Sequence, residues 1–143
     1  MKKRIFLLLC VCLCATLLCS CATLMQPINQ ASAESKLEKI EQECVAMEYE
    51  VRRLEESEMN SVIESVVSGE GIVLKGPAVG MLMYTYEEQE SYVVATVIAM
   101  SSAKDAETLA DAMKRMTDDA ATESLSVEVT RSGMIVTMLQ IYG

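Results

Sequence analysis

Methionine and cysteine are the residues whose numbers and spacing point most directly to chemistry, because their sulfur atoms are ligands for soft metals. The 143 residues include 11 methionines and 6 cysteines. The methionine pairs that could offer thioethers to Cu(I) are Met81 with Met83, Met113 with Met116, and Met134 with Met138. Methionine also fills gaps in apolar cores, and this chain has no tryptophan. We expect packing to be their role, with Cu(I) binding as the alternative.

No catalytic set is evident. The sequence contains no histidine, which excludes Ser-His-Asp and Cys-His catalysis and histidine-ligated zinc. The carboxylates within 87–90 and 118–119 lack the interleaved spacing of a calcium loop. The glycines and lysine of 69–76 do not have the order of a phosphate loop. The sequence therefore predicts a protein that is not an enzyme and has no cofactor or metal.

Five of the six cysteines lie within the first 21 residues, which have the features of a secretory signal peptide. Lys2, Lys3 and Arg4 form a positive segment, and an apolar run from Ile5 to Leu18 follows it. The alternating cysteines of 10–14 are apolar filler in such a segment. Cys44 then stands apart in the chain, either buried or paired with another chain.

The segment Leu18-Cys19-Ser20-Cys21-Ala22 resembles the processing site of bacterial lipoprotein precursors. In that family a leucine lies three residues before an essential cysteine, and a small residue precedes it directly. The resemblance implies that residues 1–20 are removed and that Cys21 carries the lipid at the mature N-terminus. Cys19 departs from the alanine or serine preferred at its position. The resemblance covers residues 1–22 only, and no family is recognised for the mature domain.

Two other outcomes of processing are open. Ala31-Ser32-Ala33 is an A-x-A site, so cleavage after Ala33 would release a secreted protein without lipid. The uncharged apolar run reaches about Met25, long enough for a retained membrane anchor.

The mature chain is strongly acidic. Without residues 1–20 it keeps nine basic side chains against 21 acidic ones, a net charge of −12. Such a charge repels phosphate backbones and anionic lipid headgroups. A nucleic-acid partner is therefore not expected.

A long amphipathic helix is predicted over residues 35–68, after a lipidated N-terminus and tether over 21–34. Its apolar positions follow spacings of three and four, which is the seam of a short coiled coil. This helix interface comprises Leu37, Ile40, Cys44, Met47, Val51 and Leu54. It could bind a protein partner, pack on the chain's own sheet, or associate with a second copy, although glutamates beside the seam disfavour a self-pair.

Residues 69–143 are predicted to form a small α+β domain. Short apolar runs over 71–76, 78–86 and 92–100 read as strands, the last two joined as a hairpin. A helix begins near Ser102, and a second hairpin with its turn at Gly133 ends the chain. The predicted order is α-β-β-β-α-β-β, with four or five antiparallel strands and helices on one face.

These features predict an extracytoplasmic lipoprotein of the cell envelope, held to the membrane by its N-terminal lipid. Its domain is expected to bind another protein. The alternatives are a homo-oligomer with a short coiled-coil stalk and a secreted module that binds a small ligand or Cu(I).

Overall fold

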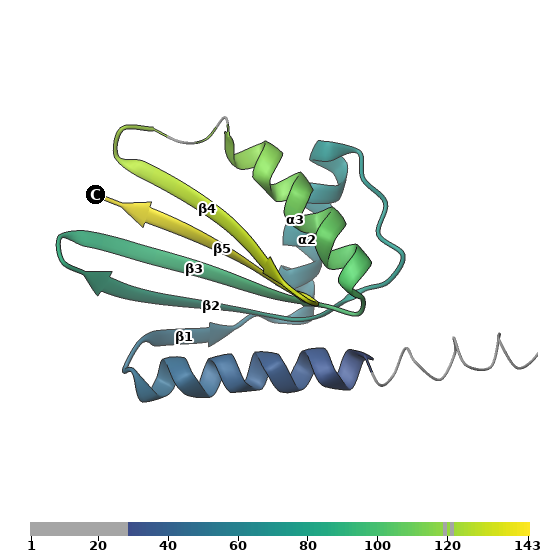
Figure 1. The fold of residues 1–143 in the computed structure, drawn as a ribbon, viewed down its shortest axis with the longest axis horizontal. Helices are drawn as coiled ribbons and strands as arrows, with labels where there is room; N and C mark the ends of the chain where they lie inside the picture. The colour runs from purple at the N-terminus through teal and green to yellow at the C-terminus, as the bar shows by residue number, and fades with distance from the viewer. Residues whose placement is uncertain (1–28, 119, 121) are drawn as a thin grey trace, which may run out of the picture.

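An antiparallel five-stranded sheet organises the computed structural model, which describes residues 29–118, 120 and 122–143 (Figure 1). The α+β class predicted from the sequence is confirmed. A helix over residues 29–46 comes first. The elements that follow are β1 (Glu50–Arg53), α2 (Glu56–Glu70), β2 (Ala78–Glu88), β3 (Ser91–Met100), α3 (Ala103–Asp118), β4 (Leu125–Ser132) and β5 (Ile135–Tyr142).

The strand order in the sheet is β1-β2-β3-β5-β4, and every neighbouring pair is antiparallel. Both predicted hairpins are confirmed as β2–β3 and β4–β5. Gln89 and Gly133 have φ values of 58° and 60°, the left-handed conformation that tight hairpin turns require. The two hairpins meet side by side where β3 pairs with β5.

Helices cover both faces of the sheet, whereas the sequence predicted helices on one face. Helices α2 and α3 pack on one face, and the helix over 29–46 lies on the other (Figure 1). The uncharged sequence of β3 suits this position, because a strand buried on both faces does not alternate with polar residues. The three layers therefore place two cores on opposite sides of one sheet.

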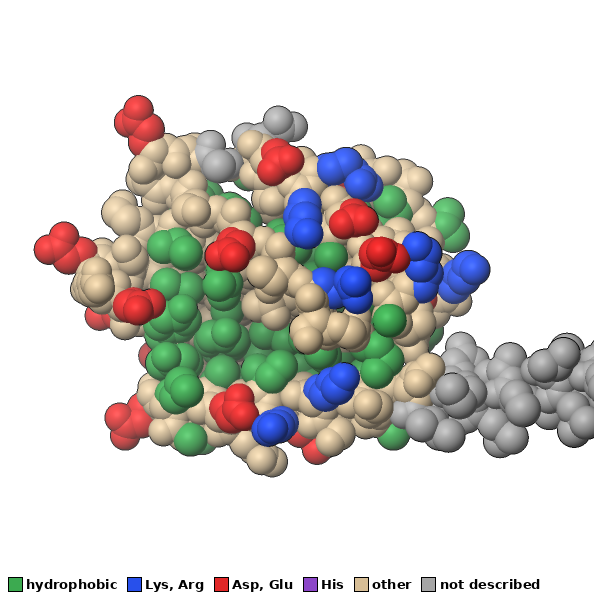
Figure 2. Space-filling model, viewed as in Figure 1, with side chains coloured by type: hydrophobic (Ala, Val, Ile, Leu, Met, Phe, Trp, Pro, Cys, Tyr) green, Lys and Arg blue, Asp and Glu red, His purple; other side chains and the backbone are tan. Residues whose placement is uncertain are grey.

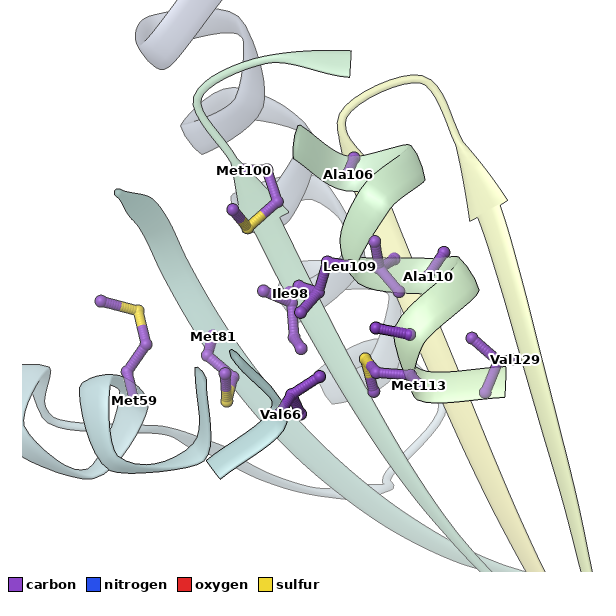
Figure 3. Packing of buried hydrophobic residues seen from close by; sticks show 12 residues of the cluster. Met59, Val66, Met81, Ile98, Met100, Ala106, Leu109, Ala110, Met113 and Val129 are labelled. Atoms are coloured by element: carbon purple, nitrogen blue, oxygen red, sulfur yellow. The ribbon is translucent and has the colours of Figure 1, made fainter. Parts of the chain in front are cut away.

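The first core lies between the sheet and helices α2 and α3. Leu109 and Met113 of α3 approach Ile98 of β3, while Met59 and Val66 come from α2 (Figure 3). The helix α3 buries Ala106, Leu109, Ala110 and Met113 in this core, whereas Met116, which continues the same apolar stripe, is 37% exposed.

The second core joins the N-terminal helix to the sheet. Ala33 and Leu37 are fully buried against Leu82, Val97 and neighbouring side chains. The two layers approach closely at Gly80, where a Cβ atom would lie 2.7 Å from Leu37 Cδ2. Arg53 of β1 fixes the helix further through ion pairs with Glu34 and, at 3.1 Å, with Glu41.

The single helix predicted over 35–68 is wrong, because a turn and β1 interrupt it. The first helix ends at residue 46 in a Schellman arrangement: Tyr49 N donates to Cys44 O, and Glu48 N donates to Val45 O, both at 3.0 Å. Glu48 has a φ of 61°, a conformation in which glycine is usual. The second half of the predicted helix is α2, which ends with Gly71 as its left-handed cap.

The strand predicted over 71–76 is also wrong. This segment is a loop, and its backbone amides at Lys75 and Gly76 each donate a 2.9 Å hydrogen bond to the carboxylate of Asp105. Ser102 caps α3 as predicted, since its Oγ accepts a hydrogen bond from Asp105 N at 3.1 Å. The Asp105 side chain therefore ties the loop to α3.

Candidate functional site

The predicted lipidation site lies outside the described residues, as do Leu18, Cys19 and Ser20. The alternative cleavage point does not. Ala33 is fully buried inside the N-terminal helix, and Glu34 pairs with Arg53. Residues 29–34, which were predicted to be tether, are thus part of the fold. Cleavage after Ala33 would remove the first turn of a packed helix and a core side chain.

The described part of the chain contains no helix that is both long and apolar enough to cross a membrane.

The predicted helix interface is divided among three places. Leu37 and Cys44 are buried and Ile40 packs beside the second core. Met47 is 61% exposed in the turn after the helix. Val51 belongs to β1, and Leu54 packs against the first core on the other side of the sheet. The continuous coiled-coil seam is therefore wrong, and packing on the chain's own sheet accounts for its first half.

Cys44 is buried, as one of the two readings of the sequence expected. Burial raises the pKa of its thiol, and the charge of Glu43 raises it further. Since the thiolate is the reactive form, we expect iodoacetamide to modify Cys44 in the native protein at least about tenfold more slowly than in urea. Mass spectrometry over a time course checks this, and equal rates in the two conditions would contradict the buried position.

A groove lined by tyrosines lies at one edge of the sheet, where β1 begins. Its volume is about 430 Å³. Tyr49 stacks on Tyr86 with ring centroids 4.6 Å apart, and Tyr84 lies within about 6 Å of both rings. Burial raises the pKa of Tyr84 and of Tyr86, so both phenols stay neutral. The lining residues are Met47, Glu48, Tyr49, Glu50, Thr85, Tyr86, Glu87 and Tyr92.

The register of β1 leaves the groove open along the backbone of β2. Glu50 is the first residue of β1 and pairs with Thr85. The end of β2, over residues 86–88, therefore pairs with β3 on one side, and no strand among the described residues pairs with it on the other. Tyr92, at the start of β3, is 45% exposed. The groove thus combines aromatic side chains with a short open strand edge.

Unpaired carboxylates surround the groove. Within the described residues, no lysine or arginine lies within ion-pair distance of the five carboxylates around the groove. The basic residues that do form ion pairs bind acids elsewhere: Arg52, Arg53, Lys104 and Arg115. Figure 2 shows acidic side chains at the end where the β2–β3 turn lies and basic ones nearer the opposite end. The carboxylates concerned are Glu48, Glu50, Glu87, Glu88 and Glu90.

A second groove, of about 350 Å³, is apolar and lies between α2 and α3. Met113, Met116 and Met138 line it together, so three of the six methionines considered for Cu(I) meet there. Met81 is instead fully buried in the first core, and Met134 packs beside the second core. Among the residues that the structure describes, no group of three or more cysteine, aspartate or glutamate side chains could hold a metal ion.

Sequence reasoning missed the tyrosine groove. Tyr84 and Tyr86 alternate along a predicted strand, so a shared face could have been inferred from them. Tyr49 was placed inside a helix, which hid its pairing with Tyr86. Comparison of the chain with protein-family models, with curated proteins and with solved structures found no match.

Proposed function

We propose that the protein is a lipoprotein of the cell envelope, anchored outside the membrane through a lipid on Cys21, and that its domain binds another protein without catalysis. The lipobox-like segment supports the anchor. The main observation in favour of the anchor is the complete burial of Ala33, because the alternative cleavage after Ala33 would cut into the fold.

The spacing between anchor and domain suits this function. Seven residues separate Cys21 from the first described residue of the helix, residue 29. Fully extended, they span at most about 25 Å. The domain would therefore work close to the membrane surface, and its net negative charge would keep it from lying against anionic headgroups.

The tyrosine groove supports binding as the role of the domain. It combines exposed aromatic area with carboxylates that have no described ion-pair partner. Aromatic side chains at a partly desolvated site are the anchors that protein interfaces favour. The oligomer built on a continuous coiled-coil seam is not proposed, because β1 divides that seam.

The intact mass of the mature protein tests the anchor. Expressed in a bacterium with its own leader, the native chain is expected to begin at Cys21 and to carry acyl groups. The Cys21→Ser variant is expected to keep its leader, because the lipid has no sulfur to attach to. A product that begins at Glu34 without lipid would refute the anchor.

A further inference from the structure

The tyrosine groove lies at the end of the domain opposite to the point where the chain enters it. Residue 29 begins the N-terminal helix, whose 18 residues over 29–46 extend about 27 Å along the sheet. Met47, Glu48 and Tyr49, which form part of the groove, follow directly where that helix ends. In Figure 1 the helix runs from the grey trace at one side to the β2–β3 turn at the other. A tether attached before residue 29 would leave the groove facing away from the membrane.

The chemistry of the groove selects for a cation with an apolar or planar body. Its carboxylates can accept charge-assisted hydrogen bonds, which are shorter and stronger than neutral ones. Its tyrosine rings present π faces that attract cations. A guanidinium group is such a cation, and its planar shape lets it stack flat on a ring. Met47 adds a flexible apolar surface that is 61% exposed.

We propose that this groove binds an arginine-containing, extended basic segment of a partner protein. The arginine side chain lies against Tyr92, and Glu50 and Glu87, whose side chains project from the same face of the sheet as Tyr92, hold the guanidinium. The open edge of β2 over residues 86–88 offers backbone hydrogen bonds to the extended segment. This proposal rests on the proposed function in one respect: the lipid anchor sets the direction in which the groove faces. The chemistry of the groove does not depend on the anchor.

Charge complementarity favours this occupant over a second copy of the chain or a membrane surface. A second copy would bring another net charge of −12 toward the same carboxylates. An anionic lipid surface would be repelled in the same way. A basic segment is attracted instead, and its association would be faster at low ionic strength.

The test uses the full acylated protein in non-ionic detergent and a fluorescent octapeptide of alternating serine and arginine. A matched peptide replaces each arginine with citrulline, which keeps the shape and removes the charge. Fluorescence anisotropy gives the dissociation constants. We expect the citrulline peptide to bind at least about tenfold more weakly than the arginine peptide.

Two triple variants with the same change in net charge locate the site. We expect the groove triple, Glu48→Gln with Glu50→Gln and Glu87→Gln, to weaken binding of the arginine peptide at least about tenfold. The control triple is expected to weaken it by less than about twofold. The control replaces three exposed acids elsewhere, Glu38→Gln with Glu64→Gln and Glu128→Gln.

A single variant separates the aromatic contribution from the charge. Tyr92→Leu keeps an apolar side chain and is expected to weaken binding of the arginine peptide about threefold or more. Melting temperatures of all variants confirm that they are folded. Equal losses in the two triples, or no binding at about 1 mM peptide, would overturn the proposal. These binding measurements do not depend on lipidation. A negative result here can therefore be distinguished from a negative result in the anchor test.

Discussion

Replacing Leu37 with alanine is expected to lower the free energy of unfolding by about 2–5 kcal/mol. Leu37 is fully buried between the N-terminal helix and the sheet, where it contacts the surface left open by Gly80. Truncation removes buried methyl groups and leaves a cavity that a rigid helix-sheet contact fills only in part. Urea denaturation followed by circular dichroism measures the change.

Val45→Ala is the matched control on the same helix. Val45 is 62% exposed, so its truncation removes little buried surface and should change the free energy of unfolding by less than about 0.5 kcal/mol. Similar small losses for the two variants would mean that the helix over 29–46 is not packed on the sheet. That result would also reopen cleavage after Ala33, because the helix would then be dispensable.

The sequence predicts the second half of the fold well because its signals are local. The apolar runs of β2 and β3, the start of α3 at Ser102 and the turn at Gly133 can each be recognised from a few consecutive residues. Each of these signals agrees with the packing that the tertiary structure imposes. The α+β class follows from them alone.

The first half could not be predicted, because pairing between distant segments overrides local preference there. Residues 35–68 are rich in helix-forming glutamate, and no glycine or proline marks the end of the first helix. Glu48 takes the left-handed position that glycine normally would, and Val51 pairs with Tyr84 instead of extending a helix. Helical spacing runs through the break: Leu37 and Ile40 do face the second core, and Val51 and Leu54 keep the same spacing although they lie beyond the helix.

The tyrosine groove could not be predicted for the same reason. Its parts come from the turn before β1, from β2 and from the start of β3, and only the register between β1 and β2 brings them together. The helix predicted over residues 35–68 includes Met47 and Tyr49, so it separates them from the strands that form the rest of the groove. The acidic residues of the β2–β3 turn were recognised, but no local pattern linked them to aromatic partners.

Replacing Asp105 with alanine is expected to lower the free energy of unfolding by about 2–3 kcal/mol. Asp105 is 3% exposed, and its carboxylate accepts the backbone N–H groups of Lys75 and Gly76. Without the carboxylate, these two amides lose their acceptor in a partly buried place.

Amide hydrogen exchange distinguishes this local role from a general loss of stability. In Asp105→Ala, exchange at Lys75 and Gly76 should accelerate more than exchange in the central strand β3, because the loop loses its attachment while the sheet keeps its ladder. Asp111→Ala, an exposed site on the same helix, should change the free energy of unfolding by less than about 0.5 kcal/mol and leave the loop amides protected. If the two variants behaved alike, the carboxylate of Asp105 would not be what holds the loop over 71–77 against α3. The connection from α2 to β2 would then depend on apolar contacts alone, chiefly those of Ile72 and Leu74 with the first core.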